Sequence, residues 1–297
     1  MKPVVGVIGL GAMGQGMAQS LRRAGFQLRV FDLRPGVAEG FARDGGTACA
    51  SAAELAQGCE VVVSVVVNAA QTEDVLFGSG DAAASLPAGS VFVMCSTVDP
   101  NWSAALEARL AERGLLYLDA PISGGAAKAA SGQMTMMTSG RPEAYARCGG
   151  VLDAMAAKVY RLGDRAGAAS KVKIINQLLA GVHIAAAAEA MALGLREGVD
   201  PAALYEVITH SAGNSWMFEN RMAHVLAGDY TPLSAVDIFV KDLGLVLDLA
   251  RTSKFPLPLS STAHQMFMQA STAGFAQQDD SAVIKIYPGI KLPEPKA

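Results

Sequence analysis

The chain has 297 residues, of which 51% are hydrophobic and 17% are charged, and its formal net charge is −3 at pH 7. This length allows two domains with separate cores. The balanced charge, without a basic run, excludes an extended nucleic-acid surface. The four cysteines and four histidines show neither disulfide nor metal-ligand spacing, so we expect no bound metal. The N-terminus leads straight into a strand, and the longest uncharged stretch, about 174–188, is too short to cross a bilayer, so we predict a cytoplasmic protein with no membrane partner.

The N-terminal segment predicts a strand, a glycine-rich turn and a helix. Val4 to Ile8 is a short β-branched run of the kind that forms a buried strand. It is followed by Gly9-Leu10-Gly11-Ala12-Met13-Gly14, a GxGxxG turn that opens a helix. The first glycine permits the tight turn, the second lets the backbone approach a pyrophosphate, and the third lets the helix pack close to the strand. Because the positive end of the helix dipole faces the turn, we interpret it as a dinucleotide phosphate site.

A second strand, Gln27 to Phe31, ends at Asp32, 18 residues after Gly14. An acidic side chain at this place can accept a hydrogen bond from the ribose 2′-hydroxyl, and it repels a 2′-phosphate. We therefore predict NAD as the cofactor rather than NADP. Arg34 leaves the alternative open, because a guanidinium two residues further on could pair with that phosphate.

The next part of the chain alternates apolar strands with helical patterns. Strands are expected at 61–67, 91–95, 115–118, 133–138 and 159–162. Such alternation implies right-handed βαβ crossovers and a doubly wound parallel sheet that contains all these strands. Because ligands bind beyond the carboxyl ends of the strands, Asn68, Thr97 and the run 119–125 become candidate binding residues.

Beyond Gly163 the pattern becomes helical. Residues 168–196 are predicted to form one long helix, and further helices are expected at 201–210, 216–227, 235–253 and 260–273. The predicted fold class is therefore an α/β Rossmann-type doubly wound sheet followed by an all-α C-terminal domain, joined by a long helix. We place an NAD-binding domain at 1–163 and an all-helical substrate and oligomerisation domain at 164–297.

The run Asp119-Ala120-Pro121-Ile122-Ser123-Gly124-Gly125 follows a strand on the ligand-binding edge. The Ser123 hydroxyl and the unshielded N–H groups of Gly124 and Gly125 could hold a substrate carboxylate. An ordinary proline-glycine loop explains the same residues, and the run alone does not decide between the two.

In the long helix, Lys173, Asn176 and Gln177 stand at positions i, i+3 and i+4 and therefore share a face. An amine in a mostly apolar cleft is less stable as a cation, so it can exchange protons near neutral pH. The two amides could hold a substrate hydroxyl or the amine itself. The alternative is a solvated helix lysine, which is what we expect Lys171 to be.

Lys241 lies off the apolar stripe of the helix at 235–253, and its spacing from Asp237 favours a surface ion pair. Polar side chains that could recognise additional substrate hydroxyls gather in the helical region at His210, Asn214, Ser215 and Asn220.

Five stretches together resemble the β-hydroxyacid dehydrogenases, a family that includes 3-hydroxyisobutyrate dehydrogenase and tartronate semialdehyde reductase. They are GLGAMGQGM at 9–17, MCSTVDP at 94–100, DAPISGG at 119–125, KIINQ at 173–177 and KDLGLVLD at 241–248. They span nearly all of the chain in order. Within the family, VKIINQLLAGVHIA, HSAGNSWMFENRM, DYTPLSAVDIFVKDLGLVLD and DDSAVIKIY are similar to members that act on a small polyhydroxy acid.

The resemblance implies NAD-dependent oxidation of a secondary alcohol with Lys173 as the catalytic acid/base. It also implies that Ser123, Gly124 and Gly125 bind the substrate carboxylate and that Thr97 and Lys241 contact the cofactor. In the mechanism that follows, we expect Asn176 or Gln177 to orient the hydroxyl. For Lys241 the resemblance outweighs the surface-pair interpretation. A small hydroxy-acid substrate and a homo-oligomer, either a dimer or a tetramer, are the implied partners.

The sequence departs from the family pattern near the catalytic lysine. Many members carry a glycine four residues before it, but Ala169 stands there relative to Lys173, whereas Gly167 precedes Lys171 by four. The Asn-Gln pair three and four residues on favours Lys173, and Lys171 stays as the alternative. Two other functions stay open: a 3-hydroxyisobutyrate-type or tartronate-semialdehyde-type oxidoreductase, and a non-catalytic NAD-binding scaffold or sensor.

Overall fold

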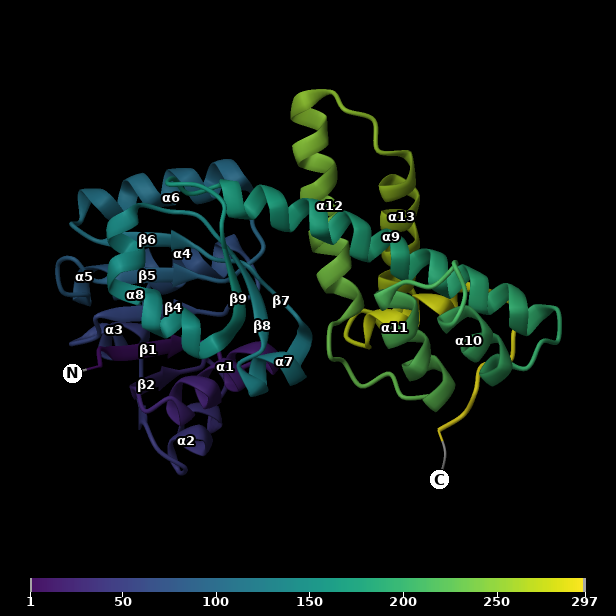
Figure 1. The fold of residues 1–297 in the computed structure, drawn as a ribbon, viewed down its shortest axis with the longest axis horizontal. Helices are drawn as coiled ribbons and strands as arrows, with labels where there is room; N and C mark the ends of the chain where they lie inside the picture. The colour runs from purple at the N-terminus through teal and green to yellow at the C-terminus, as the bar shows by residue number, and fades with distance from the viewer. Residues whose placement is uncertain (1, 296–297) are drawn as a thin grey trace. The chain divides into compact units, whose positions relative to one another are not determined.

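The computed structural model describes residues 2–295 and divides the chain into two compact units (Figure 1). The first unit ends at Lys173 and the second begins at Ile174. The division falls inside the long helix, whereas the sequence places the domain boundary at 163/164. That boundary stays a prediction for the extent of the NAD-binding domain.

The first unit contains a six-stranded parallel sheet with the strand order β3-β2-β1-β4-β5-β6. Its strands are β1 (Val4–Ile8), β2 (Gln27–Phe31), β3 (Thr47–Ala48), β4 (Val61–Ser64), β5 (Val91–Met94) and β6 (Leu116–Asp119). Because β1 pairs with β2 on one side and with β4 on the other, the strand order reverses at β1. Ligands of such sheets bind beyond the carboxyl ends of the strands at this reversal. The predicted Rossmann-type doubly wound sheet is confirmed.

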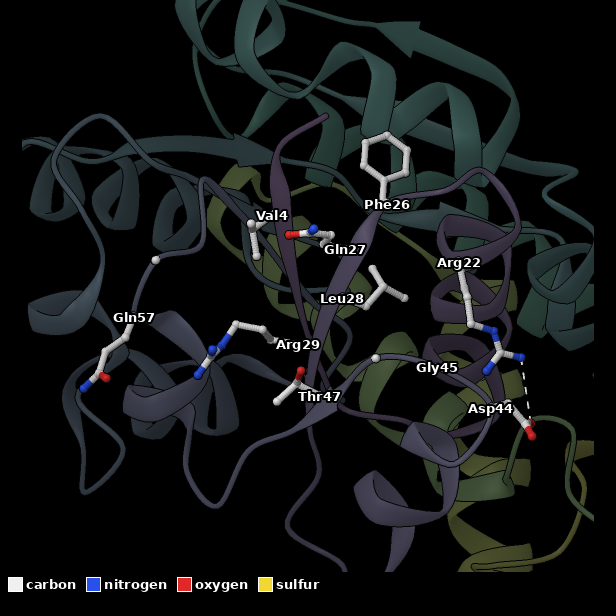
Figure 2. A pocket seen from close by; sticks show the side chains of 12 residues that line it. Val4, Arg22, Phe26, Gln27, Leu28, Arg29, Asp44, Gly45, Thr47 and Gln57 are labelled. Atoms are coloured by element: carbon white, nitrogen blue, oxygen red, sulfur yellow. Dashed lines mark ion pairs between the residues drawn. The ribbon is translucent and has the colours of Figure 1, made fainter. Parts of the chain in front are cut away.

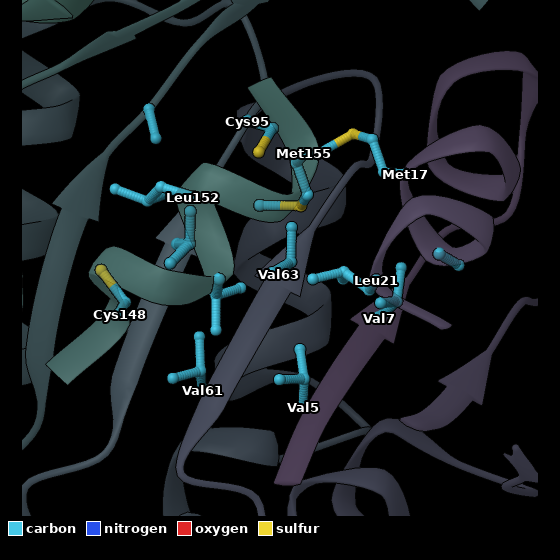
Figure 3. Packing of buried hydrophobic residues seen from close by; sticks show 14 of the residues in the cluster. Val5, Val7, Met17, Leu21, Val61, Val63, Cys95, Cys148, Leu152 and Met155 are labelled. Carbon is cyan, nitrogen blue, oxygen red and sulfur yellow. The ribbon is translucent and has the colours of Figure 1, made fainter. Parts of the chain in front are cut away.

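Helices cover both faces of this sheet, which is why its strands are almost uniformly apolar. The helices are α1 (Ala12–Arg23), α2 (Val37–Ala42), α3 (Ala52–Ala56), α4 (Ala69–Phe77), α5 (Ala82–Ser85), α6 (Pro100–Glu112), α7 (Gly125–Ser131) and α8 (Pro142–Met155). On one face, Met17 and Leu21 of α1 and Leu152 of α8 pack against the inward valines of β1 and β4 (Figure 3). On the other face, Leu55 of α3 and Leu106 of α6 pack against the opposite side chains of the same strands. Burial of each such side chain stabilises the fold by about 1.5–3 kcal/mol.

Two of the predicted strands leave the main sheet. β8 (Met134–Thr138) and β9 (Ala156–Arg161) form a separate three-stranded sheet with β7 (Ile122–Ser123), in the order β7-β8-β9. The expectation that residues 133–138 and 159–162 complete the main sheet is therefore wrong. Apolar periodicity indicates a strand but not its neighbour: β8 pairs antiparallel with β7 and meets β6 at the antiparallel bridge between Asp119 and Ser139.

The second unit is helical, as predicted. α9 (Ala168–Arg196) begins in the first unit and continues into the second. It is followed by α10 (Pro201–Thr209), α11 (Trp216–Ala227), α12 (Val236–Ser253), α13 (Pro258–Ala270), the π-helical turn η1 (Ser271–Phe275) and the 3₁₀ helix η2 (Asp280–Ile286). The bounds of α9 and α11 agree with the predicted ones. The expected all-α C-terminal domain is thus confirmed.

Gly181 explains why α9 and α12 lie close together within this unit. A Cβ atom at Gly181 would come within 3.0 Å of the side chains of Phe239 and Leu243, both on α12. The absent side chain therefore lets the two helices approach. This contact brings Gln177, one turn before Gly181 on α9, beside Asp242, which precedes Leu243 on α12.

α9 is, within residues 2–295, the helix whose length and hydropathy of 1.7 would allow it to cross a membrane. Half of its apolar window is buried inside the molecule. A core helix of a globular protein passes the same test, so this helix is weak support for a membrane location.

Candidate active site

The glycine-rich turn links β1 to α1 with the geometry that a dinucleotide requires. Gly9 has a φ of +87°, a conformation that disfavours a side chain, and a Cβ at Gly14 would lie 1.8 Å from the Gly9 carbonyl oxygen. A Cβ at Gly11 would meet no atom within 4 Å. Gly11 is also the N-cap of α1, and no side chain caps that helix. The first and third glycines therefore serve the fold, while Gly11 leaves space above uncapped N–H groups where a phosphate fits.

A cavity of about 800 Å³ lies at this edge of the sheet. Its lining includes Gly9 and Gly11 from the turn, Asp32 and Arg34 after β2, and Asn68 after β4. The cavity is large enough for a nucleotide. The predicted phosphate turn and the predicted ribose-binding carboxylate thus line one space within the first unit.

Asp32 is held by several donors at the rim of this cavity. Its carboxylate accepts hydrogen bonds from the backbone N–H groups of Leu10, at 2.7 Å, and Arg34, at 2.9 Å. The Arg34 guanidinium donates two more, from Nε to Oδ1 and from Nη2 to Oδ2, each at 2.9 Å. The guanidinium hydrogen bonds lower the pKa of Asp32 to about 2, against the opposing effect of burial. The carboxylate is therefore ionised at neutral pH, and Arg34 is tied to it.

Asn68 and Thr97 follow β4 and β5, as predicted. The Asn68 side chain caps α4, because its Oδ1 accepts a hydrogen bond from the Gln71 N–H at 2.9 Å. Thr97 is half-buried directly after Ser96, whose hydroxyl donates to the Val66 carbonyl at 2.7 Å. The two loops at this edge are thus fixed by local hydrogen bonds before any ligand binds.

The predicted carboxylate cradle lies between β7 and α7. Ser123 is the last residue of β7 and pairs with Thr135 of β8. Gly124 and Gly125 follow with φ values of +138° and +77°. Other residues rarely adopt these conformations, so both positions require glycine and leave their N–H groups unshielded.

Asp119, the first residue of the run 119–125, had no role predicted from the sequence. It is fully buried, and its carboxylate accepts hydrogen bonds from the N–H groups of Gly167 and Ser170 and from the Ser170 hydroxyl, at 2.9, 3.0 and 2.7 Å. Burial raises its pKa, and these hydrogen bonds oppose the rise. Asp119 therefore anchors the start of α9, less than one turn before Lys173. An aspartate directly after a strand was the available signal, but its partners lie about 50 residues away in the sequence.

The structure separates the two candidate lysines. Lys173 is 7% exposed, whereas Lys171 is exposed to solvent. Further along α9, Gln177 is buried and Asn176 is half-buried. A buried lysine next to a pair of amides on one helix face matches the predicted acid/base group better than Lys171 does.

Lys241 lies beside another carboxylate than the one that its spacing suggested. Its ammonium lies 2.8 Å from Oδ1 of Asp242, while Asp237 accepts a hydrogen bond from the Ser271 hydroxyl at 2.6 Å. The structure thus gives Lys241 a carboxylate partner at Asp242, and its part in cofactor binding stays a prediction. Asp242 is 2% exposed and also receives a hydrogen bond from Gln177. Sequence reasoning did not single out this residue.

The polar cluster proposed for recognition of substrate hydroxyls makes local contacts. Ser215 caps α11, the Asn214 amide donates to the Thr209 carbonyl, and the His210 ring contacts the Glu206 carbonyl. Asn220 accepts a hydrogen bond from Arg221. These contacts give the four side chains a structural role, and their part in substrate recognition stays a prediction.

A second cavity, of about 580 Å³, lies at the opposite edge of the main sheet, where the strands begin (Figure 2). Its Arg22 guanidinium stacks on Phe41 and lies 3.9 Å from the Asp44 carboxylate of the same lining, and its Arg29 donates to the Glu54 carbonyl at 2.7 Å (Figure 2). Ligands of parallel sheets bind at the carboxyl ends instead. This cavity therefore does not compete with the site described above.

A parallel sheet with this turn, an ionised carboxylate after β2 and a helical second unit define an NAD(P)-binding oxidoreductase. Residues 4–163 match the family described as the NAD binding domain of 6-phosphogluconate dehydrogenase. Residues 167–287 match the family described as NAD-binding of NADP-dependent 3-hydroxyisobutyrate dehydrogenase. The chain belongs to this 3-hydroxyisobutyrate dehydrogenase-like family and is an NAD-dependent hydroxyacid dehydrogenase.

Individual relatives agree with this assignment. The chain is 71% identical over 289 residues to an L-threonate dehydrogenase of Cupriavidus necator, with 97% of each chain covered. It is 54% identical over 293 residues to an L-threonate dehydrogenase of Pectobacterium atrosepticum, covering 98% and 96% of the two chains. A crystal structure of a Salmonella typhimurium 3-hydroxyisobutyrate dehydrogenase superposes with a TM-score of 0.92 at 54% identity, covering 96% and 100%. These relatives carry two different substrate names.

Proposed function

We propose that this protein oxidises L-threonate at C2 to 2-dehydro-L-erythronate, with NAD as the cofactor and Lys173 as the acid/base. The observation that carries the proposal is the buried Lys173 on the helix face that also bears Asn176 and Gln177. The substrate is supported by the names of the two most similar relatives given above. NAD is supported by the ionised Asp32 at the cavity rim.

Different residues bind the cofactor and the substrate in this proposal. NAD, when bound, accepts the hydride from the substrate carbon. We propose that Gly9, Leu10, Gly11, Ala12, Met13, Gly14, Asp32, Asn68, Thr97 and Lys241 hold the cofactor. Ser123, Gly124 and Gly125 bind the substrate carboxylate, since their unshielded N–H groups favour an anion.

Lys173 performs the proton transfer in this mechanism. In its neutral form the amine takes the proton of the substrate hydroxyl as the hydride leaves, and the resulting ammonium stabilises the new carbonyl oxygen. Asn176 or Gln177 orients a substrate hydroxyl. A positioned acid/base accelerates such a step by about 10²- to 10⁴-fold.

The experiment is to follow NADH formation with the purified protein on L-threonate, D-threonate, D-erythronate, glycerate and 3-hydroxyisobutyrate, each with NAD and with NADP. Turnover of L-threonate with NAD at the highest kcat/KM is the expected result. A preference for 3-hydroxyisobutyrate or glycerate would overturn the substrate but keep Lys173. Tight NADH binding without turnover of any acid would favour the non-catalytic scaffold or sensor.

The partner that we propose for this protein is a second copy of itself. Along α9 of the second unit, large and small apolar side chains share one exposed face, namely Ile175, Leu179, Ala186, Ala190 and Leu193. In an antiparallel pair of these helices about a two-fold axis between residues 182 and 183, Ile175 meets Ala190 and Leu179 meets Ala186, so these two large side chains face small ones, and Leu193 lies toward each end of the contact. The face is thus complementary to itself.

Light scattering after size exclusion tests this interface. Leu179→Glu should dissociate the assembly, and Leu259→Glu, at a similarly exposed leucine on α13, should leave its mass unchanged. A wild-type monomer at micromolar concentration would refute the interface. We further propose a cytoplasmic location, which the balanced charge and the metabolic reaction support.

A further inference from the structure

The amide groups that we assign to substrate binding are connected to a buried carboxylate. Gln177 Nε2 donates a hydrogen bond to Oδ2 of Asp242 at 2.5 Å, and Asn176 Nδ2 donates to Oε1 of Gln177 at 3.0 Å. Asp242 is 2% exposed, and its other oxygen, Oδ1, lies 2.8 Å from the Lys241 ammonium. These contacts form one chain within the second unit, from Lys241 through Asp242 and Gln177 to Asn176.

Lys241 and Asp242 form an ion pair, and the chemistry and positions of the other groups fix the direction of the two hydrogen bonds that follow. An ionised carboxylate accepts hydrogen bonds and cannot donate. Gln177 must therefore turn its NH₂ group toward Asp242, and this orientation places its carbonyl oxygen on the side of Asn176, 3.0 Å from Nδ2. Asn176 must in turn give its own NH₂ group to Gln177. Its carbonyl oxygen, Oδ1, then forms the outer end of the chain.

We propose that Asp242 is a positioning residue that makes Asn176 present an acceptor, and not a donor, to a substrate hydroxyl. This inference rests on the proposed function, because it concerns the same site. A hydroxyl donates its single proton to one acceptor. Since the reacting hydroxyl gives its proton to Lys173, the hydroxyl that donates to Asn176 is a neighbouring one. The chain therefore selects acids that carry a second hydroxyl next to the reacting carbon.

Asp242→Asn reverses the chain with almost no change of shape. The Lys241 ammonium is a donor only, so it keeps the amide oxygen of residue 242 on its side and turns the new NH₂ group toward Gln177. Gln177 then has to present its oxygen to residue 242 and its NH₂ group to Asn176, and Asn176 turns its own NH₂ group outward. A donor then faces the substrate hydroxyl, which costs about 10- to 100-fold in kcat/KM.

A second substitution restores the original direction and gives the decisive test. In Gln177→Glu combined with Asp242→Asn, the carboxylate moves one position along the chain. It accepts from the amide at 242 and from Asn176 Nδ2, so Asn176 again presents Oδ1. We expect the double variant to recover kcat/KM on L-threonate to within about fivefold of wild type, while Gln177→Glu alone, which opposes two carboxylates, stays impaired.

The controls separate this effect from loss of structure or of cofactor. Asp248→Asn makes the same substitution on the exposed face of α12 and should leave kcat/KM unchanged. Thermal unfolding of each variant measures the stability of the fold. NADH titration measures the cofactor affinity to which Lys241 is proposed to contribute. Equal losses in the single and double variants, or equal losses on L-threonate and on 3-hydroxyisobutyrate, which lacks the second hydroxyl, would overturn the proposal.

Failure of the proposed function is recognised separately. If the wild type prefers another acid that carries a second hydroxyl, such as glycerate, the substrate proposal fails and the variants are compared on that acid. A preference for 3-hydroxyisobutyrate would refute the selection by Asn176 as well. If it oxidises none, the Asn176 side-chain amide proton shifts in ¹⁵N-labelled protein serve as the measurement. Asp242→Asn should move them and the double variant should return them, and a failure to return would refute the chain.

Discussion

The cofactor turn of the first unit and the amide pair of the second unit are organised in different ways. In the turn, backbone groups make the decisive contacts, and Asp32 is tied to Leu10 and Arg34, at most 22 residues away. In the second unit, side chains make them, and Gln177 is tied to Asp242 across 65 residues. A backbone site is sensitive to added atoms, whereas a side-chain site is sensitive to the direction of its hydrogen bonds.

The largest expected effect is at Lys173, the last residue of the first unit. Lys173→Ala should lower kcat by at least about 100-fold, because it removes the proposed proton acceptor. NADH affinity should stay near the wild-type value, because the turn and Asp32 are untouched. Steady-state kinetics and an NADH fluorescence titration measure the two quantities.

Lys171→Ala is the matched control for that substitution. The residue lies on the same helix but is exposed, so its loss should change kcat less than twofold. A large loss in Lys171→Ala with normal activity in Lys173→Ala would transfer the catalytic role to Lys171, the alternative that the position of Gly167 supports.

The next largest effect distinguishes two glycines of one turn. Gly14→Ala should destabilise the fold by about 3 kcal/mol, because its Cβ would meet the Gly9 carbonyl oxygen at 1.8 Å. Gly11→Ala should change stability by less than about 1 kcal/mol, since its Cβ meets nothing within 4 Å, but should weaken NADH binding about tenfold. Thermal unfolding without cofactor and NADH titration test both, and similar melting shifts for the two variants would contradict this division.

The same contrast explains what the sequence could predict. The glycine turn, Asp32 and the order of strands and helices follow from residue spacing within about 30 residues, and the structure bears out this fold. The bounds of α9 follow from its apolar, proline-free sequence. Local physical rules decide these features, so a single sequence contains them.

Features that depend on distant partners were not predictable in the same way. The strands at 133–138 and 159–162 were expected in the main sheet because periodicity does not name a neighbour. Helix spacing alone favoured Asp237 as the partner of Lys241, but the structure places Asp242 beside the Lys241 ammonium and gives Asp237 a hydrogen bond from Ser271. The hydrogen-bond partners of Asp119 and Asp242 lie about 50 and 65 residues away in the sequence, so no local pattern indicates them.

A smaller effect is expected at the ribose end of the cavity. Asp32→Ser should weaken NAD binding and strengthen NADP binding, each by about tenfold, because it removes the carboxylate and releases Arg34 for a 2′-phosphate. Arg34→Ala in that background should abolish the gain for NADP. Affinities measured by titration with both reduced cofactors decide the matter, and an unchanged preference in Asp32→Ser would show that Arg34 is not the discriminating group.

The smallest effect concerns a buried charged cluster of the second unit. The His224 ring lies 3.4 Å from Oδ1 of Asp279, and the interaction with this carboxylate raises the pKa of His224 above its ordinary 6.5, against the effect of burial, with Arg221 and Asp280 nearby. A raised folded-state pKa stabilises the fold below pH 6.5, and this contribution is lost as the pH rises through the folded value. His224→Gln should therefore lower the melting temperature near pH 6 and have less effect near pH 9, a difference worth less than about 1 kcal/mol. A larger loss at the higher pH would mean that the neutral ring stabilises the cluster, so that the side chains of the second unit are held there by packing and not by charge.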